Sequence, residues 1–473
     1  MKCLWLAALA TVPAVWGLSP LRSTPESTPE ANRLSLQVSP GLPHDPQSSV
    51  DVPNEEAWAE VATRKKRKLC FVRPGADDED DAPRILHALN KECRSKSIVV
   101  LPGPVYSIRS PMNTTHLDDV ELHQFGRLHW SPDIEYWLSV SMPVGFQNQS
   151  TVWHFGGKWV TWEGHGFGTM DGNGQVWYDW AHGRGNLAHR PMTINFHGLK
   201  DSTLRGLRFV QAQMWTMNIM YSRNLILDDI YVNNTSTSEH NTLNTDGVDT
   251  MYSDNITFSR WSVTNGDDAV ALKANSTNIR LYDSEFWDST GIAIGSMGQY
   301  KDHDEHIYNF HVKNVTMHNV IRGCYFKSWT GVQTGYPPNG GGGGTGYAGN
   351  VLMEDIVLDH TRMEPLLITQ CESYNGHGGE NCFTSKFRIG NITWRNWSGW
   401  TGTSKERSAW FKCSEASGGC HNVTVEGWNV KKGRTDETLD LWHCDNMNEH
   451  SGFKCEGQED LDSTAGGWSE DDL

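Results

Sequence analysis

A degenerate repeat recurs through the middle of the chain, and it restricts the possible folds more than any other feature. Three clear copies, SRNLILDDIYV, SDNITFSRWSV and STNIRLYDSEF, begin at Ser222, Ser253 and Ser276. Weaker copies share this pattern and lie near Asp201, Asn309, Asn350 and Asn422. The Asn or Asp that marks the repeat falls at positions 201, 224, 255, 278 and 309, so the steps are 23, 31, 23 and 31 residues.

Each copy has the character of a strand. Apolar and polar residues alternate, β-branched residues are enriched, and polar or Gly turns bound each copy. A strand-bearing unit of this length cannot bury its own apolar face, so the repeat predicts a solenoid. We therefore expect an all-β chain folded as a right-handed parallel β-helix. A leucine-rich horseshoe would need a Leu pattern that is absent, and a sandwich or propeller would not need such steps.

The two longer steps predict loops. Each is a basic step plus about eight residues, NNTSTSEH after Val232 and GQYKDHDE after Met297. A Gly-rich stretch, YPPNGGGGGTGY at Tyr336–Tyr347, lacks the Lys-Ser/Thr of a phosphate loop. We expect it to be a flexible loop at the edge of a cleft.

The chain ends differ from this repeat region. Residues 1–17 resemble a secretory signal peptide, with Lys2 before an apolar stretch and small residues near Gly17. Residues 18–68 are rich in Pro, Ser and Thr and are expected to be a disordered leader, with the basic run RKKRK at 64–68 as a processing or linker segment. The β-helix domain is expected over 69–456, followed by an acidic tail at 457–473. No later apolar run is long enough for a transmembrane helix.

Cysteine usage also predicts secretion. Eight cysteines fall into couples close in sequence, 70/93, 371/382, 413/420 and 444/455, which an oxidising compartment would join as disulfides, although the sequence leaves the connectivity open. Cys324 is left over and is expected to be a free buried thiol. Acceptor patterns for N-glycans occur at Asn113, Asn148, Asn275 and Asn396.

The charge balance excludes one class of partner. The formal net charge of -17 argues against nucleic acid, whose binding needs clustered Lys and Arg. We expect a secreted monomer that binds neither nucleic acid nor membrane. The 21 Trp residues suit sugar faces as well as an ordinary core.

Three aspartates stand out because the repeat brings them together. Asp246 lies nine residues before Asn255, and Asp267 and Asp268 lie eleven and ten before Asn278. Coils of a β-helix stack at about 4.8 Å, so these carboxylates should meet on one outer face, with the two inserted loops on either side. Asp249, Asp254 and Asp283 are expected to be ordinary turn residues.

Crowded carboxylates allow three explanations. They can be solvated turn residues, or they can bind calcium, which prefers several oxygen ligands. The third explanation is paired acid and base catalysis, in which mutual repulsion keeps one proton bound at mildly acid pH. Glycoside hydrolysis uses that chemistry.

Several motifs resemble the polygalacturonases, glycoside hydrolase family 28, over about residues 70–440. NTDGVD at Asn244–Asp249 and GDDAVALK at Gly266–Lys273 are similar to the two acidic motifs of that family, and GTMDGNGQVWYD at Gly168–Asp179 and Arg190–Pro191 to its upstream signature. KANSTNI and GSMGQY resemble its fungal exo-acting branch.

The resemblance implies an inverting mechanism without cofactor or metal, on a pectic polysaccharide. Asp267 would be the general acid, and Asp246 and Asp268 would activate the water. Asn244 would contact the substrate.

Two departures from the family pattern affect specificity. Thr290 stands where the family usually has His, and Tyr325 stands where it has the Arg of Arg-Ile-Lys, which leaves only Lys327 as a cation for a galacturonate carboxylate. Loss of the Arg fork removes a charged hydrogen bond of about 1.5–3 kcal/mol. We expect Thr290, Tyr325 and Lys327 to bind substrate, with Tyr325 stacking on a deoxy sugar.

The leading hypothesis is therefore a secreted, exo-acting pectin hydrolase that favours a rhamnose-containing backbone. A galacturonan-specific exopolygalacturonase is the alternative. A polysaccharide lyase would need Ca²⁺ and a basic proton abstractor, and a non-catalytic sugar-binding β-helix would not need all three Asp.

Overall fold

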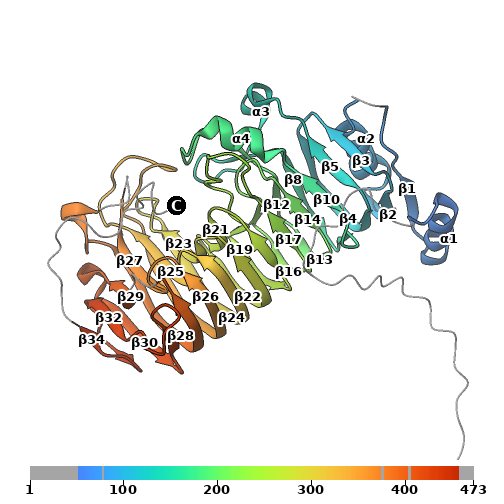
Figure 1. Ribbon diagram of the computed structural model, residues 1–473. Coiled ribbons are helices and arrows are strands. Elements are labelled where there is room, and N and C mark those ends of the chain that lie inside the picture. The colour runs from blue at the N-terminus through green and yellow to red at the C-terminus, as the bar shows by residue number, and fades with distance from the viewer. Residues whose placement is uncertain (1–51, 77–78, 374–377, 403–405, 457–473) are drawn as a thin grey trace, which may run out of the picture. The chain divides into compact units, whose positions relative to one another are not determined.

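The parallel strands of this chain stack coil upon coil into a right-handed parallel β-helix, as the repeat predicts (Figure 1). The computed structural model describes residues 52–76, 79–373, 378–402 and 406–456. The expected signal peptide, most of the expected leader and the acidic tail lie outside the described residues.

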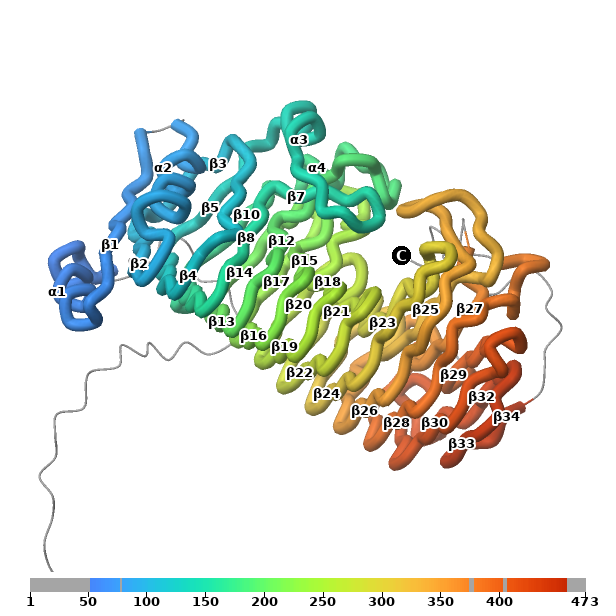
Figure 2. Tube along the Cα trace, turned by 180° about the vertical axis from the view of Figure 1, so that it is seen from behind, coloured from blue at the N-terminus to red at the C-terminus, as the bar shows by residue number. Residues whose placement is uncertain are grey.

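The coils form three parallel ladders, which run side by side in Figure 2. The first, called the site ladder below, contains β8 (Trp153–Lys158), β12 (Ile194–His197), β15 (Met217–Met220), β18 (Val248–Met251), β21 (Asp268–Leu272), β23 (Gly291–Met297), β25 (Cys324–Trp329), β27 (Leu366–Glu372), β29 (Arg407–Lys412), β32 (Leu441–Asp445) and β34 (Cys455–Glu456).

The second ladder contains β1 (Lys68–Phe71), β2 (Ser95–Leu101), β4 (Met112–Gln124), β9 (Thr161–Glu163), β13 (Lys200–Arg205), β16 (Arg223–Asp228), β19 (Ser253–Ser259), β22 (Ser276–Trp287), β24 (Asp304–Val320), β26 (Thr345–Thr361), β28 (Lys386–Thr401), β30 (Cys420–Glu426) and β33 (His450–Ser451). The third contains β3 (Val105–Ile108), β5 (Arg127–Trp130), β10 (Thr169–Asp171), β14 (Arg208–Val210), β17 (Tyr231–Asn233), β20 (Ser262–Thr264) and β31 (Asn429–Lys431), together with the later parts of β22, β24, β26 and β28.

The core lies inside the coils, because alternate residues of each strand point inward. Equivalent inward residues pair in register from coil to coil, so each apolar side chain packs on the one below it. One such buried column consists of Leu225, Ile256, Ile279, Phe310 and Val351.

The repeat asparagines form a bend within the strands of the second ladder that contain them. They adopt the left-handed conformation, which Asn tolerates better than most residues. The Nδ2 of Asn255 donates to the Oδ1 of Asn224 at 2.9 Å, and Asn350 donates to Asn309 at 3.2 Å. The marker position of the repeat is therefore a hydrogen-bonded ladder that fixes the coil spacing.

The expected leader boundary at residue 68 is wrong. Residues within that leader form α1 (Glu55–Lys65), which is capped by the Asn54 side chain at Ala57 N. The helix buries Trp58 against Ile98 and Val100 of β2. Burial of the apolar face of α1 stabilises the helix, although the composition around it is polar. The basic run ends the helix instead of forming a linker.

Four disulfides join the couples 70/93, 371/382, 413/420 and 444/455, as the sequence spacing predicts. Cys324 is a free, buried thiol, also as predicted. None of the helices in the described residues combines the length and the apolar character needed to cross a membrane.

Beside the site ladder lies a small second sheet of β6 (Met142–Pro143), β7 (Ser150–Thr151) and β11 (Pro191–Met192). Strands β6 and β7 are antiparallel, so they form a hairpin, and its loop spans residues 144–149. We call this loop the strap. The short helices α2 (Ala82–His87), α3 (Ile134–Val140) and α4 (Gly174–Ala181) precede the strands that carry the aspartates.

Candidate active site

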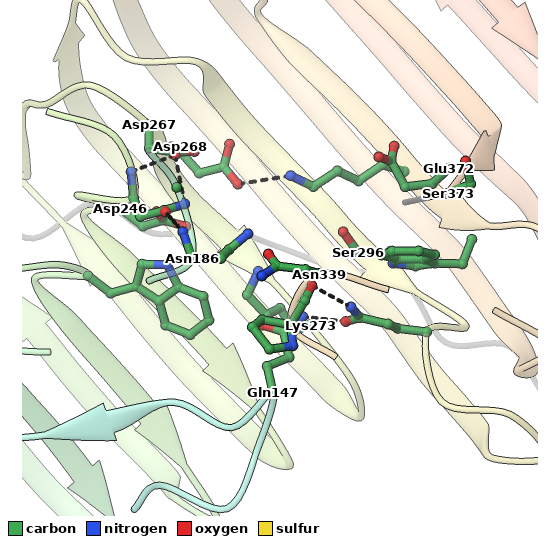
Figure 3. A pocket seen from close by; sticks show the side chains of 17 residues that line it. Gln147, Asn186, Asp246, Asp267, Asp268, Lys273, Ser296, Asn339, Glu372 and Ser373 are labelled. Carbon is green, nitrogen blue, oxygen red and sulfur yellow. Dashed lines mark hydrogen bonds and ion pairs between the residues drawn. The ribbon is translucent and has the colours of Figure 1, made fainter. Parts of the chain in front are cut away.

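The three predicted aspartates meet on the outside of the site ladder. Asp246 lies two residues before β18, and in the next coil Asp267 immediately precedes β21 and Asp268 begins it; Gly247 N donates to Asp268 O at 2.8 Å. One carboxylate oxygen of each aspartate lies within 4.8 Å of the others. Figure 3 shows the three side chains grouped on one wall of a pocket.

The pocket has a volume of about 530 Å³. Residues from the middle of the sequence, between Gln147 and Ser373, form it, and most of their side chains are polar. The lining residues are Gln147, Gly185, Asn186, Trp215, Asn244, Asp246, Asp267, Asp268, Lys273, Ser296, Gln299, Lys327, Trp329, Pro338, Asn339, Glu372 and Ser373.

Asp267 is held mainly by backbone donors. Asn244 N donates to its Oδ2 and Asp268 N to its Oδ1, both at 2.9 Å. Burial and the nearby Asp268 charge raise the pKa of Asp267 to about 6, although Lys327 and the two N–H groups act in the opposite direction. Asp267 can therefore keep its proton in mildly acid solution.

Asp246 is more deeply buried than Asp267. It is only 3% exposed, and no described residue hydrogen-bonds its Oδ1. Burial raises the pKa of Asp246 well above its ordinary value, and repulsion from Asp267, Asp249 and Asp268 adds to the effect. The cluster therefore titrates as a unit, and its protons are shared among coupled groups.

Asp268 is held by side chains from the next two coils. Its Oδ1 accepts hydrogen bonds from the hydroxyls of Thr290 and Tyr325, and Lys327 Nζ lies 3.5 Å from its Oδ2. Thr290 is 3% exposed and Tyr325 is 1% exposed, and neither lines the pocket. The expected stacking of Tyr325 on a sugar is therefore wrong, since its ring lies behind Asp268.

Lys327 does line the pocket, as expected for a substrate-binding residue. Burial alone would lower its pKa, but the charges of Asp268, Asp267 and Glu372 outweigh burial and raise it. Lys327 therefore stays protonated and offsets part of the negative charge of the aspartates.

Asn244 and Arg190 position the acids. Asn244 lines the pocket, and its Oδ1 accepts a hydrogen bond from Asn186 N at 2.6 Å. Arg190 is fully buried, and its Nη1 donates to Leu243 O at 2.9 Å. Burial lowers the pKa of Arg190 to about 10, opposed by Tyr178, Asp267 and Asp246. The upstream signature thus places a buried positive charge near the aspartates.

A second ion pair, in the pocket wall, was not expected from the sequence. Asp249 is fully buried and lies 3.2 Å from Lys273 Nζ, so its expected role as a solvated turn residue is wrong. Burial raises the pKa of Asp249 to about 7, opposed by Lys273. Lys273 Nζ also lies 4.8 Å from the centre of the Trp215 ring. Lys273 belongs to the motif GDDAVALK, so the sequence did contain a signal that a lysine lies near these acids.

The strap closes one side of the pocket. Gln147 Nε2 donates to Gln299 Oε1, and Gln147 N donates to Tyr300 Oη at 2.6 Å. Phe146 packs 5.4 Å from Tyr300 and 6.3 Å from Tyr252, measured between ring centres. The sequence contained no signal for this contact, because its partners are more than 150 residues apart.

Of the two inserted loops, the second lies at the pocket, as the repeat predicts, and the first packs on α4. Gln299 of the second insertion lines the pocket and donates to Pro338 O at 3.1 Å, so the Gly-rich loop also reaches the pocket edge. The first insertion contacts α4, where Thr237 N donates to Gln175 Oε1 at 2.8 Å.

Within the described residues, the three aspartates are also the carboxylates that lie close enough together to hold a cation. Lys327 already supplies one positive charge at Asp268. The expectation that no metal is required therefore stays a prediction.

Comparison with known proteins gives consistent relationships. The sequence profile of "Glycosyl hydrolases family 28" matches residues 138–455. Alpha-L-rhamnosidase rgxB of Aspergillus niger is 41% identical over 421 residues, covering 89% of this chain and 97% of the relative. Exopolygalacturonase of Cochliobolus carbonum is 30% identical over 411 residues, covering 86% and 89%. The crystal structure of endo-xylogalacturonan hydrolase from Aspergillus tubingensis shares the fold, with a TM-score of 0.70, 24% identity, and coverage of 82% and 99%.

Proposed function

Because this chain belongs to glycosyl hydrolase family 28, we propose that it hydrolyses pectin from a chain end and prefers a backbone that contains rhamnose. It is a pectin-degrading glycosidase. In this proposal Asp267 protonates the leaving oxygen, and Asp246 and Asp268 activate the water.

One observation carries the catalytic part of the proposal: three carboxylates with different partners share one pocket. Asp267 has a pKa raised to about 6, so a proton is available at mildly acid pH. Asp268 instead accepts hydrogen bonds from two side-chain hydroxyls and faces Lys327. Carboxylates with such different environments can divide the acid and base roles.

The stereochemistry needs its own test. The aspartate oxygens lie within 4.8 Å of one another, which is less than the roughly 6.5–9.5 Å between carboxyl groups of most inverting enzymes. The proposal of inversion therefore depends on the family resemblance. Proton NMR of the first product anomer tests it, and initial formation of the retained anomer would contradict it.

The strap supports attack at a chain end. It joins Gln147 to Gln299 across one side of the pocket, so a continuous polymer meets a wall there. A terminal sugar can enter such a pocket without threading. The anchoring of Phe146 among buried apolar side chains favours a fixed wall.

The charges of the pocket support an uncharged terminal sugar. Asp246, Asp267, Asp268 and Glu372 line it, and the cations Lys273 and Lys327 are already paired with Asp249 and Asp268. A uronate carboxylate would add negative charge without an unpaired cation among the described lining residues. The relative named alpha-L-rhamnosidase favours the same conclusion, whereas the relative named exopolygalacturonase favours galacturonan.

The deciding experiment incubates the protein with homogalacturonan, rhamnogalacturonan and an aryl rhamnoside, with and without excess chelator, and resolves the products by mass. We expect single sugars from the chain end, more from the rhamnose-containing substrates, and no effect of chelator. Release of galacturonate alone would indicate a galacturonan-specific exopolygalacturonase. Unsaturated ends with a Ca²⁺ requirement would indicate a lyase, and no product would indicate a binding protein.

The setting of the enzyme is also part of the proposal. Four disulfides suit an oxidising compartment, so we infer secretion. We infer a monomer, and light scattering of the purified protein tests that inference.

A further inference from the structure

Two buried hydroxyl groups converge on one oxygen of Asp268. Thr290 Oγ1 and Tyr325 Oη both donate to Asp268 Oδ1, and the two hydroxyls lie 3.3 Å apart. Lys327 Nζ lies 3.5 Å from Tyr325 Oη and 3.5 Å from Asp268 Oδ2. Asp268 is 1% exposed, and a buried carboxylate is stable only when its oxygens have partners.

The site ladder is built so that Tyr325 can reach Asp268. Tyr325 lies on β25, two coils beyond β21, a separation of about 10 Å at the usual strand spacing. Tyr325 pairs in register with Ala293 of β23, and Ala293 pairs with Ala271 of β21, so small residues occupy the row below the tyrosine. These alanines pack with the Tyr325 ring in one buried cluster. A larger side chain at either position would occupy the space of the ring.

We propose that Tyr325 and Thr290 are positioning residues that fix the carboxylate of Asp268 for the reaction proposed above, on which this inference rests. They act through Asp268, since neither lines the pocket. Hydroxyl donors hold the carboxylate in place without adding a second positive charge beside it.

Charged and titratable side chains face Asp268 from the neighbouring coils. Asp267 and Asp246 face it in the pocket, and Asp249 lies close on β18. Lys327 faces it from β25. Thr290 and Tyr325 do not change their charge in the acid range, so their replacement changes hydrogen bonding without removing a charge.

The test uses the full chain with Tyr325→Phe and Thr290→Val, which remove one hydroxyl each and keep the shape. For Tyr325→Phe we expect kcat to fall by about 10-fold or more with KM within about twofold, the pattern of an interaction needed in the transition state. Thr290→Ser should restore most of the activity lost in Thr290→Val.

Tyr106→Phe is the matched control. Tyr106 is also fully buried and donates its hydroxyl to Val72 O at 2.7 Å, but it lies outside the pocket. An equal loss of kcat in Tyr106→Phe would show that buried phenols matter only for folding and would overturn the proposal. A raised KM with unchanged kcat in Tyr325→Phe would overturn it too, since that result indicates a direct sugar contact.

A second measurement does not depend on activity. In a double-mutant cycle of melting temperature, the losses from Tyr325→Phe and Asp268→Ala should sum to more than the loss in the double variant, because each change removes one partner of the same hydrogen bond. Additive losses would overturn the proposal even in an active enzyme. If the natural protein releases no sugar but the losses are non-additive, the proposed function fails while the contact stands.

Discussion

Asp267 and Asp268 are neighbours in sequence with opposite surroundings. The first accepts hydrogen bonds from backbone N–H groups, and the second accepts them from side chains one and two coils away. Backbone donors are present in any sequence with this fold, whereas the side-chain donors depend on Thr290 and Tyr325. Specificity can therefore change around Asp268 without moving the acid.

The first prediction concerns Asp267. We expect Asp267→Asn to reduce kcat by about 10²–10⁴-fold, because the amide cannot donate a proton to the leaving oxygen. Asp302→Asn, a change at an exposed loop residue, is the control and should keep full activity. Near-normal kcat in Asp267→Asn, with an unchanged melting temperature, would refute the assignment.

The second prediction concerns pH. The pKa of Asp267 is raised to about 6, so the general acid loses its proton as the pH rises through 6. We expect kcat/KM to fall on the alkaline side of about pH 6, and a pH–rate profile of the natural enzyme measures this. A plateau that continues to pH 8 would mean that another group supplies the proton.

At the scale of elements, the strap is the part that the repeat could not predict. The third prediction is that Phe146→Ala loosens it, since removal of a buried aromatic ring costs about 3 kcal/mol or more of packing. We expect oligomers among the early products from the polymer, with little change on an aryl glycoside. Phe125→Ala, which removes a ring packed beside α1, is the control and should leave the products unchanged.

The fourth prediction concerns glycan acceptors, and it depends on secretion. Asn113 and Asn148 are exposed. Asn396 Nδ2 donates to Asp355 Oδ1 at 3.0 Å, and Asn275 Oδ1 accepts from His306 N at 2.9 Å, so both amides help to join coils. We expect glycans at Asn113 and Asn148, detected by peptide mass spectrometry of the secreted protein. Occupancy at Asn396 in the folded protein would contradict this view of the coil contacts.

For the whole molecule, buried acids link stability to pH. Burial raises the pKa of Asp249 and Glu305 to about 7, above the values of an unfolded chain. The folded state then binds more protons than the unfolded state, so stability falls as pH rises through these values. His154 and His165 have pKa values lowered by burial to about 4 and 3, which raises stability with pH, but only up to the unfolded value near 6.5.

The fifth prediction follows from these two opposing contributions. Between about pH 6.5 and 8 the acids still titrate while the histidines are largely neutral in both states, so we expect the melting temperature to fall. Scanning calorimetry at both pH values measures the change. Glu305→Gln removes one of the acids and should flatten the dependence, and a melting temperature that rises across this range would contradict the sign.

The local sequence determined the β-helix, the coil step and the meeting of Asp246 with Asp267 and Asp268. Period-2 strands and asparagines in left-handed bends are properties of each coil, and stacking merely repeats them. The disulfide couples were predictable for the same reason, since each joins residues close in sequence.

Only the tertiary structure decided how the pocket is closed and what lies behind Asp268. Gln147 meets Gln299 across 152 residues of sequence, and no repeat relates them. The motif position of Tyr325 predicts a contact with the sugar. The direction of its side chain, however, depends on the space above Ala271 and Ala293. A motif specifies which residues share a row, whereas the volumes of their neighbours in other coils decide which of them face the substrate.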